Sequence, residues 1–196
     1  MSTFSFLVPT HREDRPLARC LNSIAPQLGP LDEVIVIGDT HDGPLGKVES
    51  LVGSYDHRFR YVAYDAGEHD YGHSQLNHGM ALATCDYIHC NDDDDVWTPE
   101  ALRYFRAYTN QFPEPRPFLF RFQSYLGPVF WVHPGWFARN YIGGHCLLAP
   151  NVPDKLGAWG TDYSGDFDYV EATVNAYGGS SEAVWCEEIV ALARPA

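Results

Sequence analysis

The chain has no hydrophobic run long enough to cross a bilayer, no internal repeat and no low-complexity segment. A membrane-spanning helix needs about 20 consecutive apolar residues, and no stretch approaches that length. The first eight residues also lack the basic region and long apolar core of a secretory signal. We therefore expect no membrane insertion.

Paired cysteines and excess positive charge are missing as well. The five cysteines form no CxxC pair and are odd in number, which is typical of reduced thiols, so we expect a cytoplasmic protein. Acidic residues outnumber basic ones by 26 to 13, giving a net charge of −13. This balance argues against extended contact with nucleic acid or an anionic membrane. It does not exclude a small anionic ligand, because a few arginines or a cation can hold phosphates locally.

With 196 residues and 45% hydrophobic content, the chain is long enough to form one domain with a sizeable core. Apolar, β-branched runs alternate with helical patterns in its first 112 residues. We expect strands over 4–8, 33–37, 59–64 and 87–90, and helices over 16–28, 45–54, 74–84 and 99–112. This alternation requires crossover connections and predicts an α/β fold with a mainly parallel, Rossmann-like sheet flanked by helices.

After residue 112 prolines and glycines divide the chain into shorter pieces. The pattern predicts short strands over 118–122, 129–132 and 146–148 and a helix over 166–177. We expect these to form a smaller β region of the same domain, so that a single domain over 1–196 has two halves, 1–112 and 113–196.

Four consecutive aspartates, Asp92 to Asp95, follow the strand predicted over 87–90. Like charges ~4 Å apart repel by ~1 kcal/mol in water and by more near a protein surface. A hard divalent cation would relieve that repulsion, since Mg²⁺, Mn²⁺ and Ca²⁺ prefer oxygen ligands. An acidic turn that caps a helix opening at Pro99 is the alternative. In a parallel sheet, Pro9-Thr10, Gly38-Asp39 and the acidic run would all meet at the carboxyl edge, where ligands bind.

Several segments carry a resemblance to a known family. In order they are F-S-F-L-V-P-T, D-E-V-I-V-I-G-D-T-H-D-G, G-H-S-Q-L-N-H-G-M-A-L-A, D-Y-I-H-C-N-D-D-D-D-V-W-T-P-E-A-L, G-G-H-C-L-L-A-P and S-G-D-F-D-Y-V-E-A-T. The set resembles the family 2 glycosyltransferases, which have the GT-A fold and use nucleotide-activated sugars. The resemblance covers nearly the whole chain, and its most specific part is the acidic run with its W-T-P-E-A-L tail. It makes 1–112 the nucleotide-sugar-binding half and 113–196 the acceptor half.

The resemblance implies roles for individual residues. Pro9, Thr10 and Asp39 match residues that cradle the base and ribose, and Asn77 is placed among the donor-binding residues. Asp92 and Asp93 match the ribose-facing part of the D-x-D motif. Asp94 matches the aspartate that binds the divalent cation, Mn²⁺ or Mg²⁺, with Asp92 expected on the same face two residues earlier. Asp95 is expected to cap the following helix.

On the acceptor side, Asp166 matches the general base. Transfer requires a hydroxyl or amine that loses its proton while attacking the anomeric carbon, and a nearby carboxylate can accept that proton. Asp168 is the alternative base, expected to face solvent or hold a contact. Asp166 could also be a carboxylate that only favours a helix N-terminus.

This chain departs from the family where many relatives carry A-R-N-x-G, because it has Q-L-N-H-G over 75–79. Without that arginine the phosphates must be met by other groups. Arg12 is the candidate from the nearby arginines Arg12, Arg15 and Arg19, and His73 and His78 are further ones. His145 follows two glycines and could complete the cation site or bind phosphate.

The sequence thus predicts a metal-dependent, inverting transferase that moves a hexose to a soluble acceptor, with UDP-glucose as the default donor. The acceptor could be a glycan, a protein, a small molecule or a modified base. A sugar-phosphate nucleotidyltransferase is one alternative, although the loop P-T-H-R-E-D lacks the glycines usual there. A non-catalytic module that binds a nucleotide sugar is another.

Overall fold

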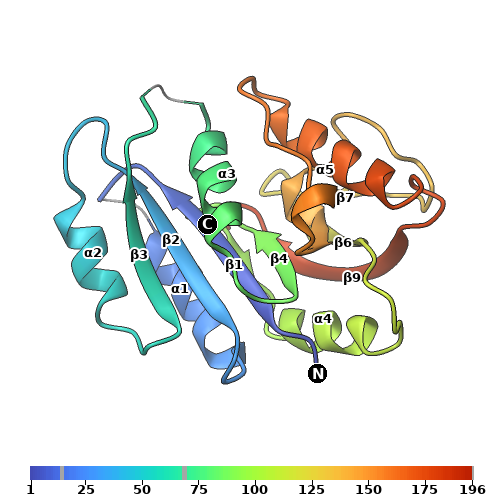
Figure 1. The fold of residues 1–196 in the computed structure, drawn as a ribbon, viewed down its shortest axis with the longest axis horizontal. Helices are drawn as coiled ribbons and strands as arrows, with labels where there is room; N and C mark the ends of the chain where they lie inside the picture. Colours follow the sequence, from blue (N-terminus) through green and yellow to red (C-terminus); the bar gives the residue numbers. More distant parts are fainter. Residues whose placement is uncertain (14–15, 68–69, 196) are drawn as a thin grey trace.

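The structure, a computed structural model, describes residues 1–13, 16–67 and 70–195. Arg15 therefore lies outside the described residues. A nine-stranded sheet runs through the molecule in the order β3-β2-β1-β4-β8-β6-β9-β5, with β7 paired to β6 (Figure 1). The expected α/β fold, with a mainly parallel sheet flanked by helices, is confirmed.

The first half is parallel, as the alternating pattern predicts. Its strands are β1 (Phe4–Thr10), β2 (Glu33–Asp39), β3 (Phe59–Tyr64) and β4 (Tyr87–Cys90). Three helices connect them, namely α1 (Leu17–Ile24), α2 (Gly46–Val52) and α3 (His73–Leu82). The helix expected over 16–28 is shorter because Pro26 lies in a 3₁₀ turn, η1 (Ala25–Gln27), that follows α1. Strands β1 and β2 are buried almost throughout, which explains their continuous apolar runs.

The second half adds mostly antiparallel pairs to the edge of β4. Its strands are β6 (Phe118–Gln123), β7 (Val129–Phe130), β8 (Leu147–Pro150) and β9 (Val184–Leu192), and β5 (Val96–Trp97) of the first half pairs with β9. Its helical segments are η2 (Gly144–Cys146), η3 (Pro153–Lys155) and α5 (Gly165–Ala176), and α4 (Ala101–Thr109) is the last helix of the first half. In Figure 1 β9 curves beneath β6, while α5 lies above this part of the sheet. The long strand β9, which pairs with β6 and β5, was not predicted.

An aromatic cluster joins the two halves in the core. The Phe6 ring meets the Trp97 ring edge to face at 4.4 Å, and Phe105 lies 5.6 Å from Trp97. His89 is fully buried among these rings. Burial lowers the pKa of His89 to about 3, so its imidazole stays neutral at physiological pH. The five cysteines are all buried and unpaired, in agreement with the expectation from their spacing.

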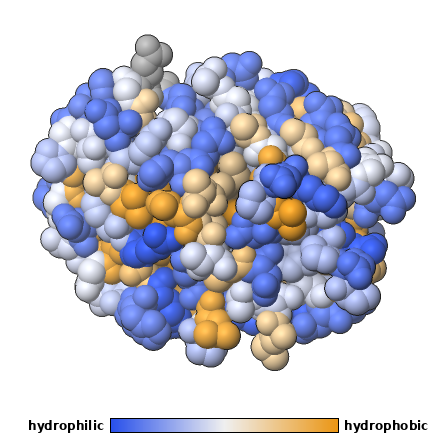
Figure 2. Space-filling view, in the orientation of Figure 1, coloured by the Kyte–Doolittle hydropathy of each residue, from blue (hydrophilic) through white to orange (hydrophobic). Residues whose placement is uncertain are grey.

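Across the described residues, no helix is both long and apolar enough to span a bilayer. Figure 2 shows hydrophilic residues over most of the margin of one face, with apolar residues concentrated toward its middle. The middle of this face is where the two halves of the sheet adjoin (Figure 1).

Candidate active site

A cavity of about 870 Å³ opens at the carboxyl ends of the parallel strands. Its walls come from the ends of β1, β2 and β4, from the start of α3, and from segments of the second half around residues 139–145 and 159–166. Every expected site residue except Asn77 lines it: Pro9, Thr10, Arg12, Asp39, Asp92, Asp93, Asp94, His145 and Asp166. The convergence expected at this edge is therefore present in the structure.

The acidic run forms a tight turn rather than a continuation of β4. The Asp95 amide donates a hydrogen bond to the Asp92 carbonyl at 3.2 Å, so the first and fourth residues of the run approach each other. Asp92 and Asp95 consequently share one side of the turn. The strand-like alternation that would place Asp92 and Asp94 on one face does not hold, because the strand has ended at Cys90.

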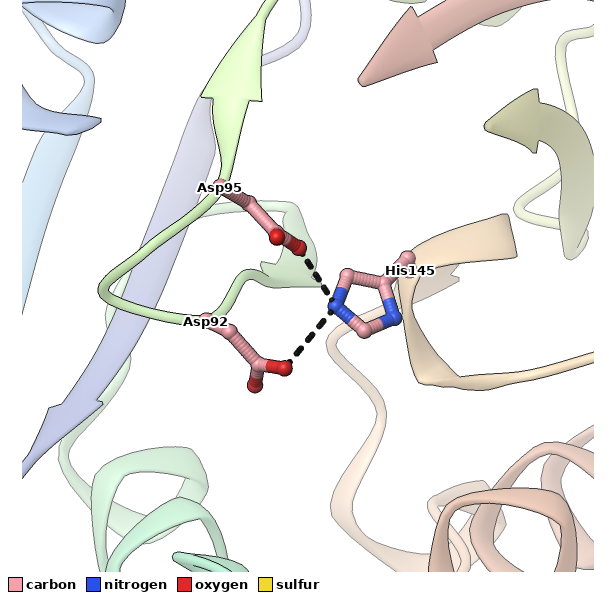
Figure 3. Close-up of side chains that lie close together, drawn as sticks. All are labelled: Asp92, Asp95 and His145. Atoms are coloured by element: carbon pink, nitrogen blue, oxygen red, sulfur yellow. Dashed lines mark ion pairs between the residues drawn. The ribbon is translucent and has the colours of Figure 1, made fainter. Parts of the chain in front are cut away.

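Asp92 and Asp95 both point at the imidazole of His145, which comes from η2 in the other half (Figure 3). The His145 Nε2 atom lies 2.7 Å from Asp95 Oδ2 and 3.3 Å from Asp92 Oδ2. Burial alone would lower the pKa of His145, but the two carboxylates outweigh it and raise that pKa well above its usual value. The arrangement concentrates two negative groups around one ring nitrogen.

These three side chains fit a divalent cation. One ligand atom from each lies within 4.8 Å of the others. Two of these atoms, Asp95 Oδ2 and His145 Nε2, are buried and have no hydrogen-bond partner of good geometry among the described residues. Two carboxylate oxygens and the imidazole nitrogen, once a bound cation has displaced its proton, form a donor set suited to Mn²⁺. Asp95, rather than Asp94, joins Asp92 and His145 here, and Asp95 does not cap α4, which begins after Glu100 without a side-chain cap.

The two residues at the corners of the turn point to other partners. Asp93 is buried, and its carboxylate accepts a 2.6 Å hydrogen bond from the Thr10 hydroxyl at the end of β1. Asp94 lies 3.5 Å from Nε of Arg194, which follows β9 and lines the cavity. The Arg194 amide also donates to Asp95 at 2.9 Å. Sequence reasoning missed Arg194, since its position depends on the unpredicted strand.

Two glycines allow η2 to approach the cavity closely. A Cβ atom on Gly143 would lie 2.8 Å from Asp166 Oδ2, and one on Gly144 would lie 2.1 Å from the Trp159 ring. The buried His89 also contacts η2, because its Nε2 lies 3.2 Å from the His145 carbonyl oxygen. The Gly-Gly-His sequence thus brings a histidine and an aspartate to the same wall.

Asp166 lies at the start of α5 and faces the cavity. Its Oδ1 accepts a 2.7 Å hydrogen bond from the Phe167 amide. Burial raises the pKa of Asp166 above its usual value, and the hydrogen bond only partly offsets this effect. A carboxylate with a raised pKa is a better proton acceptor than an exposed one. Asp168 lies outside the lining and pairs with Arg139 at 2.5 Å, as expected of the alternative that holds a surface contact.

Of the remaining predicted residues, Asp39 lines the cavity, whereas Asn77 and His78 lie outside its lining. Asp39 accepts backbone hydrogen bonds from His41 at 2.9 Å and Ala66 at 3.2 Å, which fixes its carboxylate at the end of β2. Asn77 lies outside the lining and exchanges two hydrogen bonds with the Trp159 backbone, at 3.0 and 2.9 Å. His78 stacks on a tyrosine outside the lining as well.

Structural comparison finds similar solved structures. The structure of residues 1–349 of TarS from S. aureus matches with a TM-score of 0.74 and 16% identity, covering 97% of this chain and 60% of that one. The mannosyltransferase PcManGT from Pyrobaculum calidifontis, in complex with GDP-Man and Mn²⁺, matches with a TM-score of 0.66 and 16% identity, covering 96% of this chain and 56% of that one. The chain thus spans 60% or less of each of these relatives, and at such identities the likeness concerns the fold. A search of curated proteins finds no match.

The sequence itself matches a family model. The model is described as glycosyl transferase family 2, and it matches residues 5–155. This match favours sugar transfer over the nucleotidyltransferase and over the non-catalytic module. Because the model covers well over half of the chain, the protein belongs to glycosyl transferase family 2.

Proposed function

We propose that the protein transfers a hexose from a UDP-sugar, with UDP-glucose as the default donor, to a soluble acceptor with inversion at the anomeric carbon. The observation that carries this proposal is that Asp166 lines the same cavity as Asp92 and His145 of the Asp92–Asp95–His145 cluster. The first provides a proton acceptor and the second provides a place for a cation. TarS has been solved with UDP-GlcNAc and with UDP, and PcManGT with GDP-Man and Mn²⁺, which supports a nucleotide-sugar donor and a divalent ion.

In this proposal residues 1–112 supply most of the donor site and residues 113–196 the acceptor site. Thr10 and Asp39 hold the base and ribose at the ends of β1 and β2, where backbone amides and Asp93 fix their side chains. The second half contributes His145 and Arg194 to the donor side. Arg194 brings positive charge where the chain lacks the arginine of many relatives. Arg12, which also lines the cavity, is a second cation for the phosphates.

Asp92, Asp95 and His145 would hold the cation, with Mn²⁺ or Mg²⁺ as candidates. When bound, such an ion offsets charge on the departing diphosphate. The buried Asp95 is kept in place by the Arg194 amide, so the cluster does not need to rearrange.

Asp166 would accept the proton of the acceptor nucleophile. Its raised pKa keeps it a competent base near neutral pH, and the amide of Phe167 orients its carboxylate. We place the reaction in the cytoplasm, because five buried, unpaired cysteines are typical of a reducing compartment.

The test measures nucleotide release from UDP-glucose, UDP-GlcNAc and GDP-mannose, with Mn²⁺, with Mg²⁺ or with a chelator. We expect cation-dependent turnover of a UDP-sugar, with an Asp166→Asn variant strongly impaired. Asp168→Asn is the matched control, since its carboxylate lies on the same helix outside the cavity lining. Turnover that is unaffected by chelation and by Asp166→Asn would contradict the proposal.

A further inference from the structure

A row of aromatic rings leads from solvent into the core beside Asp166. Tyr163 meets Tyr71 edge to face at 5.5 Å, Tyr71 lies 5.8 Å from His73, and His73 lies 5.2 Å from Trp159. Tyr163 and Tyr71 are 79% and 64% exposed, whereas His73 and Trp159 are buried. All four residues line the cavity. Two exposed rings at the mouth therefore rest on a buried aromatic base.

The backbone holds Tyr71 at this mouth in an unfavourable conformation. Its φ is +63°, a left-handed value that bulky residues rarely adopt, and Gly72 follows with φ +86°. A Cβ on Gly72 would lie 3.0 Å from Pro9, so the turn packs closely against the end of β1. His73 Nδ1 lies 2.6 Å from the Gly160 carbonyl oxygen, which joins the start of α3 to the second half. Strained positions of this kind concentrate at functional sites.

The charges around the mouth limit which acceptors can bind there. Asp70 and Asp166 line the cavity, and Asp162 lies one residue before Tyr163. Asp70 accepts the Ser74 amide at 2.8 Å and Asp162 the Ser164 amide at 2.9 Å. Arg139, which also lines the cavity, is engaged by Asp168. The mouth therefore disfavours anions, and Asp70 and Asp162 each accept one backbone hydrogen bond there.

We infer that Tyr71 and Tyr163 form the acceptor subsite and that the acceptor is a neutral saccharide. The apolar C–H face of a sugar ring would pack on the exposed tyrosine faces, and a ring hydroxyl would reach toward Asp166. This inference rests on the proposed function. The hydroxyl oxygen forms the new bond to the anomeric carbon of the donor, the bond from that carbon to the diphosphate oxygen breaks, and the hydroxyl proton passes to Asp166.

The first experiment measures binding without requiring turnover. Saturation-transfer NMR on the full chain with UDP and Mg²⁺, which is diamagnetic, compares methyl β-D-glucopyranoside, cellobiose and maltose with glucuronate and glucosamine. We expect transfer to the ring protons of at least one neutral sugar, and its loss in Tyr71→Ala and Tyr163→Ala. Absence of neutral-sugar binding, or stronger binding of the anionic or cationic sugar, would overturn the inference.

The second experiment uses the best neutral sugar as acceptor. Each alanine variant should raise the acceptor KM about tenfold, the size expected from losing one aromatic packing contact, and each phenylalanine variant should restore it. Tyr104→Ala on α4, outside the cavity lining, is the matched control and should leave KM unchanged. An unchanged KM in the alanine variants, or an equal rise in the control, would also overturn the inference. Slow nucleotide release without acceptor should persist in all variants, and its absence in the unmodified protein would instead count against the proposed function.

Discussion

Replacing Asp166 by asparagine separates a catalytic role of this side chain from a structural one. Asparagine has nearly the same shape and keeps an oxygen that can accept the 2.7 Å hydrogen bond from the Phe167 amide. It removes the negative charge and the ability to take up a proton, and it replaces one carboxylate oxygen by an NH₂ group. A general base contributes roughly 10²- to 10⁴-fold to a rate. We therefore expect kcat to fall by about that factor, which corresponds to roughly 3–5 kcal/mol of transition-state stabilisation.

The same variant should not destabilise the fold. Burial raises the pKa of Asp166 in the folded chain above its value of 3.8 in the unfolded chain, so ionisation of this group opposes folding. The penalty is fully present above the folded pKa and disappears as pH falls below 3.8. An uncharged amide in the same place carries no such penalty, so Asp166→Asn should be as stable as the unmodified protein at pH 7, or slightly more stable.

Two measurements test this pair of expectations. Urea unfolding from pH 7 down to pH 3.8 gives the free energy of unfolding of both proteins, and any stability advantage of the variant should shrink toward acid. The pH dependence of kcat/KM in the unmodified enzyme should show a fall of about tenfold per unit below the raised pKa of the base. If the variant lost more than about 2 kcal/mol of stability while keeping most of its activity, Asp166 would be a helix-terminus residue and the reasoning would be refuted.

Three further substitutions test the walls of the cavity. Gly144→Ala should lower the free energy of unfolding by about 1–3 kcal/mol in urea, because the added Cβ would lie 2.1 Å from the Trp159 ring. Gly46→Ala on α2 is its control, with no atom within 4 Å, and should cost nothing. Thermal unfolding should show that Mn²⁺ at 100 times its Kd stabilises the protein by about 2.7 kcal/mol, and that His145→Ala removes this gain. Asp94→Asn should retain most of it, and the opposite order of these two variants would return the cation to Asp94.

The parallel half of the fold could be predicted because a strand that is buried on both faces of the sheet appears in the sequence as a continuous apolar run. The run E-V-I-V-I has no polar interruption, and the structure makes it the buried strand β2, Glu33–Asp39. Its neighbours follow from the same reasoning, and the position of the cavity follows from the sheet edge. These predictions needed only local composition and the rule that parallel strands require crossovers.

The structure of the second half depends on contacts between distant segments, which local composition does not predict. Strand β9 includes two glutamates in the middle of its run, Glu187 and Glu188, so the segment lacks a clear alternation of apolar and polar residues. It becomes a strand because β6 and β5 pair with it, with shifts of register along β6. Arg194 reaches the acidic turn only as a result of this pairing. No pattern near residue 194 could have indicated that position.

The acidic run shows that a cluster of candidate ligands is easier to predict from sequence than the direction in which each side chain points. Four adjacent carboxylates indicate a candidate cation site by composition, but which two face the same way depends on whether the backbone is extended or turned. An extended chain would pair Asp92 with Asp94, whereas the turn closed by the Asp95 amide pairs Asp92 with Asp95. The third group of the cluster, His145, comes from the second half. Under the proposed function, the cation site would therefore require both halves to be packed together, and binding of Mn²⁺ would report the folding of the whole domain rather than that of residues 1–112.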